Sequence, residues 1–191
     1  MSGSAVPEDF LFDPERLRRY VNGEDGKFDK IAANLPSNLV LRPLQLSDHS
    51  RSYMGLLAEH TKAPAVSFER FQERFNLMKA YGNIYYIIVI EDTSQNKIVA
   101  TGTLEIEHKF IHSLSLRGRL EEIVVHQEDK DYRYTDGNLA SIILEVLTTL
   151  GKVLGCYKIT LESEDHLLDF YGKLGYKAEK GQNYMAVRYF D

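Results

Sequence analysis

The hydrophobic positions along the chain follow two periods, one typical of strands and one typical of helices. Continuous or alternating apolar runs predict strands at residues 38–44, 84–90, 97–107, 119–125, 157–162 and 183–190. The run at 84–90 is apolar throughout, so we expect a central strand that is buried on both faces. The polar stretch DTSQNK, which follows this run, predicts a hairpin connection to the next strand.

Apolar residues at helical spacing predict the remaining elements. We expect helices at residues 13–20, 47–60, 67–80, 138–154 and 165–174, the last ended by Gly175. Asp13, Ser47 and Ser67 are suited to cap the first three, and Pro14 fits the first helical position. From residue 38 onward the order is β-α-α-β-β-β-α-β-α-β, which predicts an α/β sandwich with a mixed sheet.

The first 36 residues differ from the rest because they are polar and are interrupted by Gly23, Gly26 and Pro36. We interpret residues 1–36 as an N-terminal extension that is mostly irregular apart from its one short helix. The remaining residues, 37–191, fit a single domain of ordinary size.

Composition excludes several classes of protein. The net charge of −5 gives no basic footprint for nucleic acid. Cys156 is the only cysteine, so no internal disulfide can form, which fits a reducing compartment. The first residues lack the basic start and apolar run of a signal peptide, and no window approaches about 20 apolar residues. We therefore expect a cytoplasmic protein with no nucleic-acid or membrane partner.

Six segments carry a resemblance to a known family. FLFDPERL, LVLRPL, IVATGTLEIEHKFIHS, RGRLEEIVV, LGCYKITLE and FYGKLGY match, in order and spacing, eukaryotic glucosamine-6-phosphate N-acetyltransferases of the GNAT superfamily. The resemblance runs from about Phe10 to the C-terminus, and EHKFIHS and GCYKITLE are specific to the family. It implies the GNAT fold, a mixed central β-sheet flanked by α-helices on both faces. It also implies a homodimer in which the C-terminal strand contributes to the partner's site.

The resemblance implies a reaction as well. The amine of glucosamine 6-phosphate attacks the thioester of acetyl-CoA, which yields N-acetylglucosamine 6-phosphate and CoA, a step of UDP-N-acetylglucosamine biosynthesis. Tyr171 matches the family tyrosine that faces the thioester sulfur, where a phenol can protonate the leaving thiolate. An aromatic core residue is the alternative interpretation, because twelve tyrosines are present.

Glu121 and Glu122 match a family Glu-Asp pair that holds the substrate amine, partly through backbone carbonyls. On a regular strand the two side chains would point to opposite faces. Solvated acids at the end of a strand are the alternative interpretation, and the extra methylene at residue 122 puts sugar recognition in question. The backbone N–H groups that follow hold the acetyl oxygen and the pantetheine arm in the family; here they belong to Ile123, Val124 and Val125.

Arg188 matches a family arginine that binds the sugar phosphate, and its planar fork suits that group. Thr61, Lys109 and Arg119 are weaker candidates for the same substrate, and ordinary surface charges explain the last two equally well. Pro64 replaces a family glycine near Thr61 and can reshape that loop. His108 and His112 do not form a metal site at strand spacing, so we expect no metal.

The segment between residues 126 and 140 departs from the family. The pattern of the family in this segment is R-G-K-x-L-G, which binds the CoA diphosphate through backbone N–H groups and a helix N-terminus. The matching positions here are Thr135, Asp136, Gly137, Asn138, Leu139 and Ala140. The basic side chains are lost, although Arg133 could compensate and the helix amides remain. Two hypotheses follow: an active enzyme with weakened acetyl-CoA affinity, or a catalytically impaired relative that acts as a binding or regulatory subunit.

Overall fold

The computed structural model describes residues 9–23, 25–61, 65–126, 138–181, 185–187 and 189. The chain forms two compact units, Met1–Thr160 and Leu161–Asp191, and each is described by itself. The strands of the first unit are β1 (Leu39–Pro43), β2 (Tyr85–Asp92), β3 (Lys97–His108), β4 (Leu116–Val125) and β5 (Cys156–Thr160). Its helices are α1 (Pro14–Asn22), α2 (Lys27–Asn34), η1 (Leu46–Arg51), α3 (Tyr53–Ala58), α4 (Phe68–Ala80), α5 (Ile111–Leu114) and α6 (Asn138–Val153), where η marks a 3-10 helix. The second unit contains η2 (Asp165–Leu167) and α7 (Leu168–Lys173).

The five strands form one mixed sheet in the order β1-β2-β3-β4-β5. The first four strands are antiparallel to their neighbours, and β5 runs parallel to β4. Ile88, Val89 and Ile90 of β2 have no exposed surface, which confirms the prediction of a central strand buried on both faces. The hairpin between β2 and β3 is also confirmed, since Asp92 accepts hydrogen bonds from the backbone of Ser94 and Gln95 at its turn.

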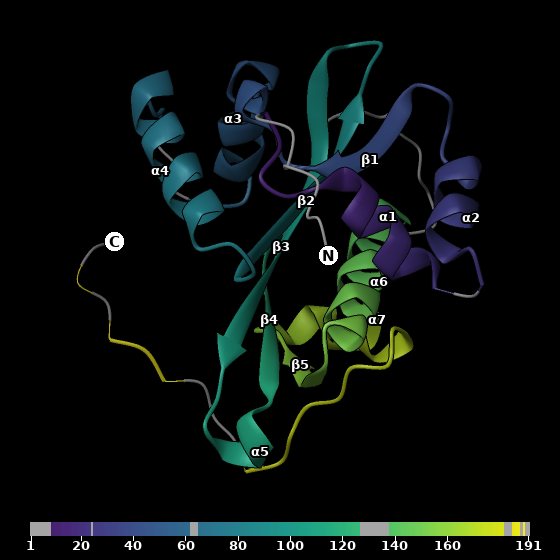
Figure 1. Cartoon of the computed structure of the whole chain (residues 1–191), viewed down its shortest axis with the longest axis vertical. Helices are drawn as coiled ribbons and strands as arrows, with labels where there is room; N and C mark the ends of the chain where they lie inside the picture. The colour runs from purple at the N-terminus through teal and green to yellow at the C-terminus, as the bar shows by residue number, and fades with distance from the viewer. Residues whose placement is uncertain are drawn as a thin grey trace, which may run out of the picture. The chain divides into compact units, whose positions relative to one another are not determined.

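Helices cover both faces of the sheet, as expected for an α/β sandwich (Figure 1). On one face α6 packs against β3 and β4, and Ile143, Leu147 and Leu150 are fully buried there. On the other face α3 packs against the same two strands and buries Tyr53. The apolar stripe of α6 is therefore the core-facing side that its helical spacing predicted, except that Val153 at the end of the helix is 51% exposed.

The N-terminal segment contains more structure than we predicted. It forms two helices, α1 and α2, where the sequence predicted one short helix in a mostly irregular stretch, so that prediction is wrong. Asp13 caps α1 as expected, and Leu17 and Val21 of α1 are buried. Lys27 of α2 pairs with Glu145 of α6 at 2.9 Å. These contacts join the segment to the sheet domain, while the boundary at residue 36 stays a prediction.

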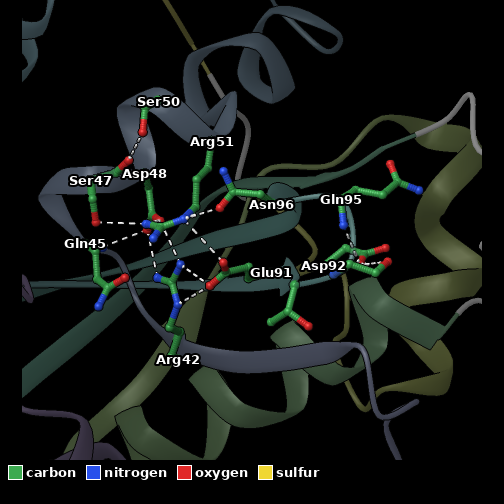
Figure 2. Close-up of polar contacts among 12 residues, drawn as sticks. Arg42, Gln45, Ser47, Asp48, Ser50, Arg51, Glu91, Asp92, Gln95 and Asn96 are labelled. Atoms are coloured by element: carbon green, nitrogen blue, oxygen red, sulfur yellow. Dashed lines mark hydrogen bonds and ion pairs between the residues drawn. The ribbon is translucent and has the colours of Figure 1, made fainter.

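The single helix predicted at residues 47–60 is interrupted. A 3-10 turn, η1, is followed by Ser52 with a left-handed φ of 61°, and α3 begins only after it. Asp48 explains the break, because its carboxylate accepts hydrogen bonds from Arg42 and from the backbone N–H of Gln45 (Figure 2). These bonds fix a tight turn that a continuous helix could not make. Ser67 does cap α4 as predicted, accepting from the N–H of Arg70.

The C-terminal strand predicted at residues 183–190 is not observed in the described part of that segment. Met185, Val187 and Tyr189 lie in irregular backbone, and their side chains are 73–88% exposed. The helix predicted at residues 165–174 is present as η2 and α7. Among the described residues, no helix is both long and apolar enough to cross a membrane.

Candidate active site

A β-bulge in β4 shapes the region that contains Glu121 and Glu122. Thr101 of β3 lies opposite Val124, and Thr103 lies opposite Glu121. Two residues of β4 therefore face the single residue Gly102 of β3, which is the definition of a bulge. Glu122 is the first residue of the bulge and has a left-handed φ of 53°, a conformation that is uncommon for a residue with a Cβ.

Gly102 makes room for the bulge on the face covered by α6. A Cβ at this position would lie 2.7 Å from Cδ1 of Ile123 and closer still to Cγ2 of Ile143. Ile123 thus turns toward α6, and any larger residue at 102 would displace it. The strained backbone at Glu122 is held in place by this packing.

The bulge brings both glutamates to the same face of the sheet. Directly opposite residues of antiparallel strands share a face, so Glu121 lies on the face of Thr103. Glu122 lies on that face too, because its Oε2 accepts a hydrogen bond from the Thr103 hydroxyl at 3.3 Å. The prediction that the two side chains point to opposite faces is wrong, since it assumed a regular strand.

The surroundings of Glu122 favour its protonated form. Burial raises the pKa of the Glu122 carboxyl; the hydrogen bond from Thr103 opposes this rise, and the negative charge of Glu121 adds to it. The residue nevertheless keeps solvent-exposed surface. Beneath it, Tyr53 of α3 is buried, and its pKa is raised by burial and by the charge of Glu122. A reachable carboxylate with a raised pKa can accept a proton from a bound ammonium.

Glu121 is held differently from Glu122. Its Oε1 pairs with the Nε of Arg119, two residues earlier on β4. The pair is partly exposed, and Arg119 has further interactions. Glu121 therefore has a cation as its partner, whereas Glu122 has a neutral hydroxyl as its donor.

Beyond Arg119, β4 presents a backbone edge on the side away from β3. The pairing of β4 with β5 ends at Arg119 and Thr160. Within the described residues no strand pairs with that side of β4 from Leu120 to Val125. Extended backbone of this kind can hydrogen-bond an elongated ligand as an added strand does. The predicted cofactor-binding positions lie on this stretch: Ile123, Val124 and Val125.

Tyr171 lies on α7, in the second unit, and is half-buried. Its ring contacts Phe170 and Tyr176 edge-on, with centroids 5.1 Å and 6.1 Å apart. Burial raises the pKa of the Tyr171 hydroxyl, so the phenol keeps its proton across the physiological range. A protonated phenol is the form that can donate to a thiolate.

Two weaker sugar-site candidates, Lys109 and Thr61, are described. Lys109 forms an ion pair with Glu107, so a phosphate would have to compete with that carboxylate. Thr61 is exposed and follows α3, with its N–H donating to the carbonyl of Leu57 at 3.1 Å. Among the described residues, no three His, Cys, Asp or Glu side chains are grouped as metal ligands.

The connection from β4 to α6 is described only at its two ends. At the β4 end, His126 contacts Lys97 through Nε2 at 2.7 Å and Glu59 through Nδ1 at 2.5 Å. At the other end α6 begins at Asn138, Leu139 is buried, and Ala140 is partly exposed. Three predicted site positions lie outside the described residues, Arg133, Gly137 and Arg188, as does the side chain of Asn138.

Sequence reasoning missed three residues of this region: Tyr53, Gly102 and Thr103. The sequence signal for two of them is the glycine between two threonines in TGT, at 101–103. An isolated glycine inside a strand pattern points to a bulge. Tyr53 gave no such signal, since its place under Glu122 depends on the turn at Ser52.

Comparisons with known proteins identify the relatives of this chain. No protein-family model matches it. It is 37% identical over 187 residues to the Drosophila melanogaster protein named "Probable glucosamine 6-phosphate N-acetyltransferase", covering 95% of this chain and 83% of that protein. It is 33% identical over 151 residues to the Arabidopsis thaliana glucosamine 6-phosphate N-acetyltransferase, covering 79% and 96% of the two chains.

Solved structures agree with these relatives. The crystal structure of the Arabidopsis thaliana enzyme matches 80% of this chain and 99% of its own, with a TM-score of 0.71 and 31% identity. A Trypanosoma brucei acetyltransferase matches 78% of this chain and 99% of its own, with a TM-score of 0.68 and 30% identity. These matches confirm the GNAT fold and an acetyltransferase enzyme. The chain belongs to the glucosamine 6-phosphate N-acetyltransferase family.

Proposed function

We propose that this protein transfers the acetyl group of acetyl-CoA to the amine of glucosamine 6-phosphate. The products are N-acetylglucosamine 6-phosphate and CoA. The observation that carries the proposal is the bulge in β4, which sets Glu121 and Glu122 on one face beside an open backbone edge. The names of the relatives give the substrate, and the bulge provides groups that can hold and deprotonate an amine.

The amine must lose a proton before it can attack. In the proposed mechanism the ammonium lies against Glu121 and Glu122, and Glu122 accepts its proton because burial raises the pKa of this carboxyl. The nitrogen lone pair then forms a bond to the thioester carbon. The negative charge that develops on the carbonyl oxygen is stabilised by backbone N–H groups of β4, from Ile123 to Val125.

The C–S bond breaks as the tetrahedral intermediate collapses. Tyr171 donates its phenolic proton to the departing sulfur, so that neutral CoA thiol leaves. The sugar nitrogen, which still carries one proton too many after its attack, loses that proton to solvent and becomes the neutral amide. Glu122 then releases its proton to solvent, and the phenolate of Tyr171 is reprotonated from solvent. Burial raises the pKa of Tyr171, which keeps the proton in place until the thiolate forms. This role follows the family tyrosine that the FYGKLGY motif matches.

Two anchors hold the substrates in this proposal. The CoA diphosphate lies at the start of α6, where helix N–H groups point toward an anion. The positions assigned to it are Arg133, Gly137, Asn138, Leu139 and Ala140. The sugar phosphate is bound by Arg188, with Thr61, Lys109 and Arg119 as further contacts.

The assembly belongs to the proposal as well. A homodimer would cover the apolar side chains of Met185, Val187 and Tyr189, which are largely exposed in the single chain. The cytoplasmic localisation of the protein remains a prediction. The alternative of a catalytically impaired regulatory subunit is not favoured, because the matching relatives carry the names of enzymes.

A thiol-release assay tests the proposal. Purified protein is mixed with acetyl-CoA and glucosamine 6-phosphate, CoA release is followed, and the product is identified by mass. We expect one CoA per N-acetylglucosamine 6-phosphate, and little release with unphosphorylated glucosamine. Tyr171→Phe should lower kcat by about a hundredfold or more, while Tyr176→Phe on the neighbouring ring should not. No release by a protein that binds CoA in calorimetry would overturn the proposal.

A further inference from the structure

Two threonines of β3, Thr101 and Thr103, flank Gly102 and share one face of the sheet. Both are buried, with 0% and 4% of their surface exposed. Thr101 donates its hydroxyl hydrogen to the carbonyl of Ile88 at 3.1 Å. Thr103 donates to Oε2 of Glu122 instead. The Thr101 hydroxyl also hydrogen-bonds the side chain of Tyr53. Of the two threonines, Thr103 is thus the one that bonds the candidate catalytic carboxylate of Glu122.

The hydrogen bond from Thr103 lowers the pKa of the Glu122 carboxyl, whereas burial and Glu121 raise it. Within the described part of the chain, Thr103 is the one hydrogen-bond donor to this carboxylate. The other polar groups that face it are Glu121, whose charge opposes ionisation, and the hydroxyl of Tyr53 from α3. Arg119 pairs with Glu121. The Thr103 hydroxyl is therefore what favours the ionised form against burial and against Glu121.

The Glu122 side chain is long and flexible, so the hydrogen bond from Thr103 also limits its orientation. The carboxyl of Glu122 sits at the end of several rotatable bonds. A free rotor of this kind loses conformational entropy when it must adopt a single orientation for catalysis. A hydrogen bond from a buried, rigid strand residue fixes that orientation before the substrate arrives.

We propose that Thr103 is a positioning residue for acetyl transfer, which holds Oε2 of Glu122 so that Oε1 is left to take the proton from the substrate amine. Thr103 does not contact the substrate in this scheme, and it acts through Glu122. The inference rests on the proposed function, because it assigns Glu122 the role of proton acceptor.

The test compares three variants: Thr103→Val removes the hydroxyl and keeps the shape, Thr103→Ser keeps the hydroxyl, and Thr101→Val is the matched control. The first readout is the titration of the Glu122 side-chain carboxyl by ¹³C NMR in protein labelled on glutamate, with its signal identified by its loss in Glu122→Gln. Thr103→Val should move this titration to higher pH, because a donor to the ionised form is lost. Thr103→Ser should restore it, and Thr101→Val should leave it at the wild-type position.

The second readout is the pH profile of kcat/KM for glucosamine 6-phosphate. We expect Thr103→Val to lower kcat/KM by about tenfold at pH 6 and by less at pH 8, with rescue by serine. An unchanged titration of Glu122 in Thr103→Val overturns the positioning contact. A shifted titration with an unchanged pH profile also overturns the inference and leaves the proposed function standing. A wild type that releases no CoA overturns the proposed function, while the NMR titration still decides whether Thr103 holds the carboxylate.

Discussion

Two regions of the sheet place carboxylates among buried polar groups. In the first region the carboxylates are paired with arginines, and in the second one of them is bound by a neutral hydroxyl. The first, which we call the arginine cluster, consists of Arg42, Asp48, Arg51 and Glu91 at the β1–β2 end of the sheet (Figure 2). Asp48 is fully buried there and accepts from both terminal nitrogens of Arg42, at 2.7 Å and 2.8 Å. It also accepts from Arg51 at 3.1 Å. The second region is the pair Glu121 and Glu122.

The difference lies in the charge of the partners. The lone pairs of Asp48 are filled by two cations and a backbone N–H, so this carboxylate has no capacity to bind an amine. Among the described residues, Glu122 has one neutral donor and an acidic neighbour, and burial raises its pKa further. Part of its surface is nevertheless exposed to solvent. We call a carboxylate saturated when cations and N–H groups fill its lone pairs, as at Asp48, and under-saturated when they do not, as at Glu122. A saturated carboxylate stabilises the fold, whereas an under-saturated one can take part in a reaction.

Removing the saturated carboxylate should have the largest effect. Asp48→Ala removes the fully buried carboxylate that Arg42 and Arg51 share and leaves them only Glu91 as a common acid in the cluster. Breaking a buried ion pair in this way costs about 3–5 kcal/mol. We expect a large fall in the urea midpoint of unfolding. If the midpoint stays at the wild-type value, the arginine cluster is not the structural element that its geometry indicates.

Replacing the under-saturated carboxylate should affect catalysis and spare the fold. Glu122→Gln should lower kcat/KM for glucosamine 6-phosphate by about a hundred- to a thousandfold, as expected when a proton acceptor is lost. Its urea midpoint should not fall. Glu145→Gln, which removes an exposed carboxylate on α6, is the control and should keep full activity. Activity within twofold of the wild type would remove Glu122 from the mechanism.

Filling the space under the bulge should have an intermediate effect on stability. A Cβ at Gly102 clashes with Ile123 and Ile143, so Gly102→Ala should cost about 1–3 kcal/mol. It should also lower activity, because the bulge aims Glu122. The matched control is Gly55→Ala in α3, where the new Cβ meets one atom, of Ser52, at an ordinary 3.6 Å. That variant should be neutral or slightly stabilised, and equal losses in the two would argue against a special role of the bulge.

The smallest expected effect is a pH dependence of stability. Burial raises the pKa of Glu122, so the folded protein binds this proton more tightly than the unfolded chain. The stabilisation from protonation is complete below the unfolded pKa and is lost as pH rises through the folded pKa. Glu122→Gln should therefore gain melting temperature relative to the wild type as the pH rises from the unfolded pKa of this carboxyl through its folded pKa. A difference that does not change with pH would show that Glu122 ionises normally.

The sequence was sufficient where local pattern decides structure. The stripe on α6, the run at β2 and the cap at Ser67 all depend on residues close together in the chain, and each was confirmed. Prediction failed where contacts distant in sequence decide. The break at Ser52 follows a turn in which Asp48 binds Arg42, and Arg42 is held in turn by Glu91, which lies 49 residues further along the chain. Such a contact leaves no periodic signal.

The candidate site shows the same division. The family match identified Glu121 and Glu122, but their placement on one face depends on a bulge that Gly102 and Ile143 permit together. Hydrophobic alternation alone gives the opposite orientation. The N-terminal segment was underestimated because α2 begins after Gly26 without a capping side chain, so it lacks the usual start signal.

A crystal structure of the protein with CoA and glucosamine 6-phosphate tests the central claim most directly. The distance to measure runs from the sugar nitrogen to the nearer carboxylate oxygen of Glu122. The account predicts a hydrogen bond of about 2.7–3.2 Å, with the Thr103 hydroxyl still bonded to the other oxygen. A sugar nitrogen that contacts neither Glu122 nor Glu121, in a complex with both ligands bound, would contradict the assignment of this pair to the amine.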